Sequence, residues 1–129
     1  MSEIQAVRRE CGLTVTYVTA EDICCVADNG IRGIIKTSGG KTALVYRGGG
    51  ENVMNRFPCA RREENITAIT LSGDRFGGGG ADDILARFHS CGVVEKLVSV
   101  SEIGMTVYVG ECEAERAWNC AQMMIKESD

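Results

Sequence analysis

The residues best suited to chemistry surround a run of four glycines, Gly77 to Gly80. The run follows a turn over Ser72 to Phe76 and precedes a helical pattern that opens with Asp82-Asp83. Glycines before a helix let the backbone approach a ligand, and the free N–H groups of the helix start favour an anion. An amino-acid carboxylate would suit this loop, with Asp74 or Asp82 receiving the ammonium group. The alternative is a loop in which Asp82 only caps the helix.

Other site chemistry has less support in the sequence. The glycine run does not match Gly-x-Gly-x-x-Gly, and no Gly-Lys-Ser/Thr follows it, which argues against nucleotide sites of the Rossmann or Walker kind. His89 and Cys91 resemble a metal-binding pair, but no second pair at zinc spacing accompanies them. His89 is the only histidine, and we expect it on the exposed side of its helix. We therefore predict no metal site, no cofactor and no catalytic residue.

Composition restricts the class of protein further. The 129 residues are 44% hydrophobic, which is enough for one domain or two very small ones. With 14 basic and 18 acidic residues the net charge is -4, which argues against nucleic-acid and membrane partners. Seven cysteines without a Cys-x-x-Cys pair indicate reduced thiols. No secretory signal and no run of roughly 20 apolar residues is present, so we expect a cytoplasmic protein.

The second half of the chain predicts a small sheet backed by two helices. Ile66 to Leu71 is an apolar strand candidate before the glycine loop, and Gly92 ends the helix after it. Alternating residues predict an antiparallel pair of strands over 93–101 and 105–109. A last helix begins at Ala114, with Trp118 as a core or interface anchor. The order is strand, glycine-rich loop, helix, strand, strand, helix.

The first half is less regular. The spacing of Ile4, Val7 and Cys11 predicts a short helix that Gly12 ends. Alternation predicts strands over 13–19 and 41–47, while 21–27 fits a strand or a helix, with the strand favoured. The only proline and a charge cluster lie in residues 51–65. We therefore expect an incomplete first unit over 1–50, a linker over 51–65 and a second unit over 66–129.

An internal repeat supports two related units. Sliding the sequence by 80 residues aligns 4–23 with 84–103, with six identities in 20 positions. The shared pattern is a helix, a cysteine and glycine that end it, a strand, and an acidic residue before isoleucine. On this alignment the first unit lacks its opening strand and the second lacks its last. Each unit could complete its sheet from its neighbour or from another chain.

The segment from Val94 to Met124 resembles the ACT regulatory domain, most closely the tandem C-terminal ACT region of aspartokinases. The residues that carry the resemblance are Val98 to Ile103, which end in Ser-Glu-Ile, then Met105 to Val109, and the acidic start of the last helix, Glu111 to Ala121. The resemblance implies an α+β fold: a tandem of ferredoxin-like βαββαβ units, with antiparallel sheets backed by helices. The loop departs from the family, which usually has a single Gly beside Pro.

The resemblance also implies a regulatory module without the kinase domain. Its partners would be a small amino-acid effector and a catalytic subunit. The missing strands favour a second copy of the chain in a homodimer, because pairing across chains would satisfy the open edges. The effector would lie at the loop and at the neighbouring strand end. The implied effector-binding residues are Ser72, Gly73, Asp74, Arg75, Phe76, Gly77, Gly78, Gly79, Gly80, Ala81, Asp82, Ser101 and Glu102.

Two other functions compete with this interpretation. One is a small oligomeric enzyme on a ferredoxin-like scaffold, with a site between subunits that would use Asp74, Glu102 or His89. The other is an RNA-binding fold of the same element order, which needs exposed aromatic residues and a basic surface. Aromatic content of 5% and the negative charge argue against the RNA-binding fold. We favour the regulatory module.

Overall fold

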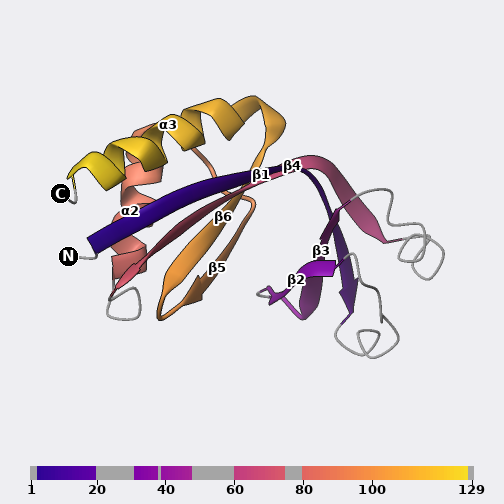
Figure 1. Cartoon of the computed structure of the whole chain (residues 1–129). Coiled ribbons are helices and arrows are strands. Elements are labelled where there is room, and N and C mark those ends of the chain that lie inside the picture. Colours follow the sequence, from indigo (N-terminus) through magenta and orange to yellow (C-terminus); the bar gives the residue numbers. More distant parts are fainter. Residues whose placement is uncertain (1–2, 20–30, 38, 48–59, 75–79, 128–129) are drawn as a thin grey trace. The chain divides into compact units, whose positions relative to one another are not determined.

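The computed structural model describes residues 3–19, 31–37, 39–47, 60–74 and 80–127, which form six strands and two helices (Figure 1). The elements are β1 Glu3–Thr19, β2 Ile31–Lys36, β3 Lys41–Arg47, β4 Arg61–Asp74, α2 Gly80–Ser90, β5 Leu97–Ser101, β6 Gly104–Gly110 and α3 Glu111–Glu127. The strands follow one another in the sheet in the order β2-β3-β1-β4-β6-β5. Neither described helix is long and apolar enough to span a membrane.

The chain divides into two compact units, and β1 and β4 each run from one into the other. Met1–Cys11 together with Thr67–Asp129 form one unit, called the outer unit below. Gly12–Ile66 form the other, called the inner unit. Both crossing strands are long, with 17 residues in β1 and 14 in β4. Each unit therefore receives strand residues from both halves of the sequence.

The outer unit has an antiparallel sheet backed by two helices, as the sequence predicts. Along the chain its elements are β4, α2, β5, β6 and α3, and the first part of β1 supplies a fourth strand beside β4. Strand β5 pairs with β6 from Leu97↔Tyr108 to Ser101↔Gly104. The order β1-β4-β6-β5 is that of a ferredoxin-like unit whose last strand comes from the beginning of the chain.

Alternation along the strands decides which face of this sheet the helices cover. In β6, Met105, Val107 and Val109 enter the core, while Thr106 and Tyr108 point to the other face. Both helices contribute to the same core, so both lie on that face (Figure 1). The helix residues of this core are Ile84, Phe88, Ala117, Cys120, Ala121 and Met124. Their spacing of three or four residues places them on one side of each helix.

The end of α2 is a glycine-terminated C-cap. Gly92 has φ of 81°, a left-handed conformation that favours glycine. The N–H of Gly92 donates to the carbonyl of His89, and the N–H of Val93 donates to that of Phe88, both at 3.0 Å. These bonds satisfy carbonyls that the helix leaves open. The prediction that Gly92 ends this helix is confirmed.

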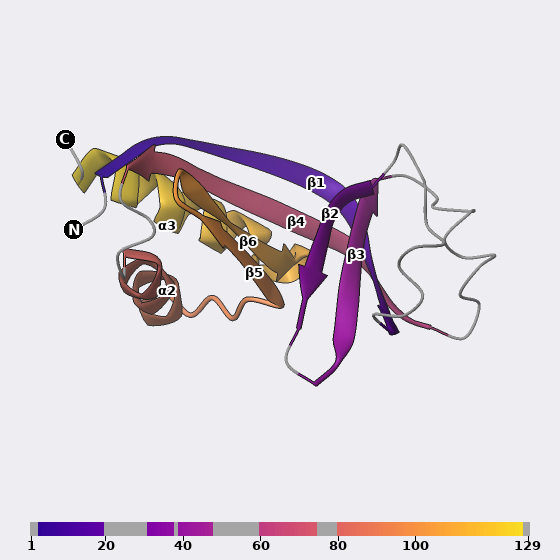
Figure 2. The same cartoon turned by 90° about the horizontal axis from the view of Figure 1, so that it is seen from below.

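The inner unit repeats the same strand order. Its sheet has the order β2-β3-β1-β4. The β2–β3 hairpin lies beside β1, as the β5–β6 hairpin lies beside β4 in the outer unit, and β4 lies on the other side of β1. The β2–β3 hairpin is visible in Figure 2. Strand β1 pairs with β3 from Leu13↔Arg47 to Thr19↔Lys41. The buried hydroxyls of Thr16 and Tyr46 lie 2.7 Å apart and share a hydrogen bond.

Two sequence predictions are wrong. Residues 4–11 form the first part of β1 rather than a helix. The spacing there matches a helix at only three positions, and strand pairing along the sheet satisfies the backbone instead. The repeat with an 80-residue offset consequently aligns this strand with α2. The shared feature of the two units is the strand order, which that alignment does not detect.

Several boundaries also differ from those expected. Strand β5 begins at Leu97, so residues 93–96 are a connection rather than part of a strand. Residues 61–65 of the expected linker belong to β4, and residues 51–59 lie outside the described residues. The segment 21–27, for which the sequence favours a strand over a helix, also lies outside them. The strands predicted over 13–19, 41–47 and 105–109 are confirmed.

Candidate functional site

The end of β4 lies against the turn between β5 and β6. The N–H of Gly73 donates a hydrogen bond of 2.9 Å to the carbonyl of Ile103. At the start of β6, a Cβ added to Gly104 would lie 2.5 Å from the carbonyl oxygen of Leu71. Side chains do not tolerate such a contact, so glycine is required for this approach. Two segments that are 30 residues apart in the sequence thus meet by direct backbone contact.

This contact brings two parts of the predicted site together. Ser72 is exposed and Gly73 is buried at the end of β4. Ser101 and Glu102 are exposed at the β5–β6 turn, and the Ser101 hydroxyl donates to the carbonyl of Gly104 at 3.3 Å. The bond from Gly73 to Ile103 fixes this strand end beside the turn. From the sequence alone, only the family resemblance groups these residues.

The remaining predicted residues lie along the loop and at the start of α2. Gly80 begins α2 and is buried, Ala81 packs against the core, and Asp82 is exposed in the first turn. Asp74 ends β4, and only its backbone is described. Arg75, Phe76, Gly77, Gly78 and Gly79 lie outside the described residues. The loop thus starts at a strand end that is fixed to a turn and finishes at a helix N-terminus that is packed on the core.

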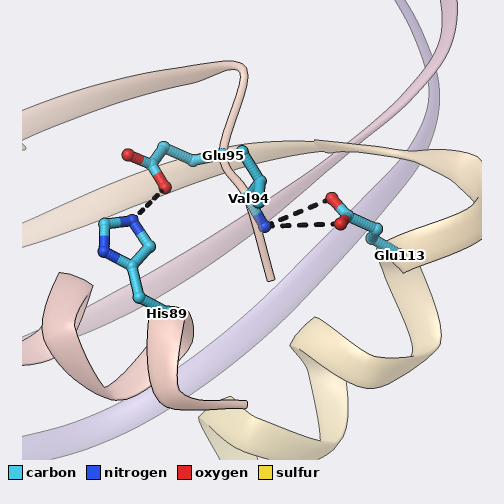
Figure 3. A network of polar contacts seen from close by, with 4 residues as sticks. All are labelled: His89, Val94, Glu95 and Glu113. Atoms are coloured by element: carbon cyan, nitrogen blue, oxygen red, sulfur yellow. Dashed lines mark hydrogen bonds and ion pairs between the residues drawn. The ribbon is translucent and has the colours of Figure 1, made fainter. Parts of the chain in front are cut away.

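A polar network at the opposite end of α2 fixes the connection from α2 to β5 (Figure 3). The imidazole Nε2 of His89 lies 2.7 Å from a carboxylate oxygen of Glu95. The N–H of Val94 donates to both carboxylate oxygens of Glu113, each at 3.4 Å, and Arg116 donates to the carbonyl of Gly92 at 3.2 Å. His89 is exposed, as predicted, and its contacts are structural. Within the described ranges, no group of three His, Cys, Asp or Glu side chains could hold a metal ion.

Two tyrosines have a pKa shifted by their surroundings. Burial raises the pKa of Tyr108, and the negative charge of Glu10 raises it further. Burial also raises the pKa of Tyr17, followed by the charge of Glu63 and its hydrogen bond, while Arg61 acts in the opposite direction. Neither tyrosine belongs to the predicted site. Tyr108 can therefore report on the stability of the outer unit and Tyr17 on that of the inner unit.

Sequence reasoning missed the two residues that hold the site's fixed edge. Ile103 acts through its backbone carbonyl, and Gly104 acts through its lack of a side chain. The available signal was a glycine directly after the Ser-Glu-Ile turn. A glycine at a strand start suggests close approach of another backbone, but it does not identify the segment that approaches.

Known proteins match this chain in structure. No family model and no curated protein matches it in sequence. Aspartate kinase from Clostridium acetobutylicum matches 96% of this chain at 14% identity and a TM-score of 0.76, and the chain spans 35% of that enzyme. The ligand-free regulatory subunit of aspartate kinase from Thermus thermophilus matches 94% of this chain at 12% identity and a TM-score of 0.74, over 98% of its own length. E. coli aspartokinase III, solved with lysine and aspartate, matches 97% at 14% identity and a TM-score of 0.67, and the chain spans 33% of it.

At sequence identities this low, the structural similarity establishes the fold alone. The match to the Thermus thermophilus regulatory subunit over nearly its full length supports the resemblance that the Ser-Glu-Ile turn and the last helix indicated. The two units with the same strand order account for the tandem character. This chain has the tandem ACT-like fold of the regulatory regions of aspartokinases.

Proposed function

We propose that this chain is a regulatory module that binds a small amino acid at the loop between β4 and α2 and controls an enzyme through effector-dependent packing. The observation that carries the proposal is the anchoring of both ends of that loop. Gly73 is hydrogen-bonded to Ile103 at one end, and Gly80 is buried at the start of α2 at the other. Such anchoring limits the ordering entropy that a ligand must overcome.

The exposed groups at these ends suit a zwitterion. The N–H groups in the first turn of α2, which have no partner within a helix, would receive the α-carboxylate. The carboxylates of Asp82 and Glu102 are exposed and would receive the ammonium group. Ser72 and Ser101 would add hydroxyls. The structure of E. coli aspartokinase III with lysine supports an amino acid as the class of ligand.

The controlled enzyme would be a catalytic subunit or an attached catalytic domain. The regulatory subunit of Thermus thermophilus supports a separate partner, since this chain matches nearly all of it. Effector binding would favour one packing arrangement over another, by no more than its difference in affinity for the two. We expect a homodimer, although the outer unit obtains its fourth strand from β1 rather than from another chain.

A thermal-shift screen against the twenty amino acids tests this proposal. A ligand at about 100 times its Kd should stabilise the protein by about 2.7 kcal/mol. Asp82→Asn and Glu102→Gln should abolish the shift. Asp83→Asn is the matched control, since Asp83 is exposed in the same helical turn and lies outside the predicted site. No shift with any amino acid, or equal loss in the control, would contradict the proposed site.

A further inference from the structure

A row of side chains that includes three polar residues and the apolar Val18 crosses one face of the inner unit's sheet. Lys36 of β2 pairs with Thr42 of β3, and Thr42 pairs with Val18 of β1. Residues directly opposite each other in antiparallel strands project to the same face. Lys36, Thr42 and Val18 therefore lie in one row across three neighbouring strands. Neighbouring strands lie roughly 4.8 Å apart.

Arg62 of β4 extends this row. The Tyr17 hydroxyl donates to a carboxylate oxygen of Glu63 at 3.2 Å, and Arg61 lies 5.0 Å from the centre of the Tyr17 ring. Tyr17, Arg61 and Glu63 thus share the opposite face of the sheet. Val18 follows Tyr17, and Arg62 lies between Arg61 and Glu63, so alternation places both on the face of the row. Strands β1 and β4 are neighbours, which brings Arg62 next to Val18.

Two atoms in this row are buried and have no hydrogen-bond partner within the part of the chain that the structure describes. Thr42 is 1% exposed, and its hydroxyl bonds to none of the groups that the structure describes. The same holds for the buried Nε of Arg62. Buried polar groups in proteins are nearly always paired, because desolvation without a partner is costly. Two unpaired donors in one row indicate a missing acceptor.

The charges in the row also favour a missing acceptor. Lys36 and Arg62 are both cationic, in a chain whose net charge is -4. Neither belongs to any ion pair among the described residues. Glu64 lies on this face by alternation, but it is exposed and forms no described ion pair with Arg62. Two cations and a hydroxyl donor form a suitable set for an oxyanion.

We propose that Lys36, Thr42 and Arg62 bind a small oxyanion, either a carboxylate or a phosphate group, on this face of the inner unit. Lys36 lies on β2, directly beside Thr42, and Arg62 lies on β4, two strands from Thr42, with Val18 of β1 between them. The hydroxyl of Thr42 and the Nε–H of Arg62 donate to the anion, and Lys36 provides the outer charge. The site is separate from the proposed effector loop, which belongs to the outer unit.

NMR titration of the full chain tests the site directly. Sodium phosphate and sodium acetate are each added at constant ionic strength, and the amide of Thr42 and the Nε–H of Arg62 are observed. We expect saturable shifts with at least one anion, and the anion that saturates identifies the source as phosphate or carboxylate. Lys36→Gln and Arg62→Gln should each weaken binding by about tenfold or more. Lys41 is an exposed residue of β3, the strand of Thr42, and lies on the opposite face of the sheet. Lys41→Gln should therefore leave binding unchanged.

Thr42→Val gives an independent test, because it removes the hydroxyl and keeps the shape. In buffer without oxyanions the melting temperature should equal or exceed that of the wild type, and addition of the binding anion should no longer raise it as much. Non-saturating shifts with both anions, or equal weakening by Lys41→Gln, would overturn the proposal. So would a lower melting temperature of Thr42→Val without anions, because it would reveal an internal partner for the hydroxyl. An amino-acid screen without hits leaves this result unaffected.

Discussion

Replacing Gly104 with alanine tests whether the contact between β4 and the β5–β6 turn holds the predicted site. The added Cβ would lie 2.5 Å from the Leu71 carbonyl oxygen and 3.4 Å from the Cα of Ser72. Real Cβ contacts essentially never fall below 3.0 Å, so the backbone of β4 or β6 must move by about half an ångström. Both partners are strand backbone, which cannot rotate away as a side chain would.

The expected cost follows from two effects that add and one that opposes them. Overpacking in a tight region costs about 1–3 kcal/mol. The shift would also weaken the bond from Gly73 to Ile103, which contributes about 0.5–1.5 kcal/mol. Alanine also lowers the conformational entropy of the unfolded chain, which stabilises the folded state by about 0.4–1 kcal/mol. The steric effect is larger, and we expect a net loss of about 1–3 kcal/mol.

Urea unfolding followed by circular dichroism measures this loss. The matched control is Gly110→Ala on the same strand, where the added Cβ would meet only the end of the flexible Lys96 side chain, at 3.2 Å. We expect the control to change stability by less than about 0.5 kcal/mol. If Gly104→Ala is as stable as the control, the backbone contact is not tight and the argument for a fixed site edge fails.

Three further predictions concern the outer unit. Gly92→Ala should destabilise the protein by about 1 kcal/mol in urea unfolding because of its φ of 81°, and an unchanged midpoint would contradict the C-cap. Phe88→Ala should cost about 3–5 kcal/mol because the ring is fully buried, while His89→Gln on the exposed side should cost less than about 1 kcal/mol; equal melting temperatures would contradict this core. The raised pKa of Tyr108 means that the folded state keeps its proton longer, so stability should be complete below pH 10.0 and fall as the pH rises above it. Tyr108→Phe should reduce that fall in melting scans from pH 8 to 11, and an identical pH dependence would contradict the shift.

The elements of the outer unit were predictable because their patterns are local. Alternation identifies the strand over 105–109, and the four-residue spacing of Ile84 and Phe88 identifies the helix after the glycines. The first part of β1 could not be identified in this way, since its conformation depends on pairing in a sheet whose other strands come from distant residues. Its apolar residues are also sparse because it lies at one edge of the outer unit's sheet.

The candidate site was predictable only in part for the same reason. The glycine loop and the acidic start of α2 are continuous in sequence. Ser101 and Glu102 are assigned to the same site only by the family resemblance. The bond between Gly73 and Ile103 is a long-range contact that no periodicity reveals. The row of Lys36, Thr42 and Arg62 likewise depends on strand order and register, because β1 lies between β3 and β4 in the sheet.

The way β1 enters the outer unit has a consequence for how the chain acquires its structure. A ribosome makes this strand well before its neighbour in that unit, the part of β4 that begins at Thr67. The contact order is therefore high, and folding should be slow compared with a helical protein of this size. Until β4 emerges, residues 3–11 lack the strand that lies beside them in this unit. Deleting them would leave β4 as an open strand edge, which is a site for aggregation.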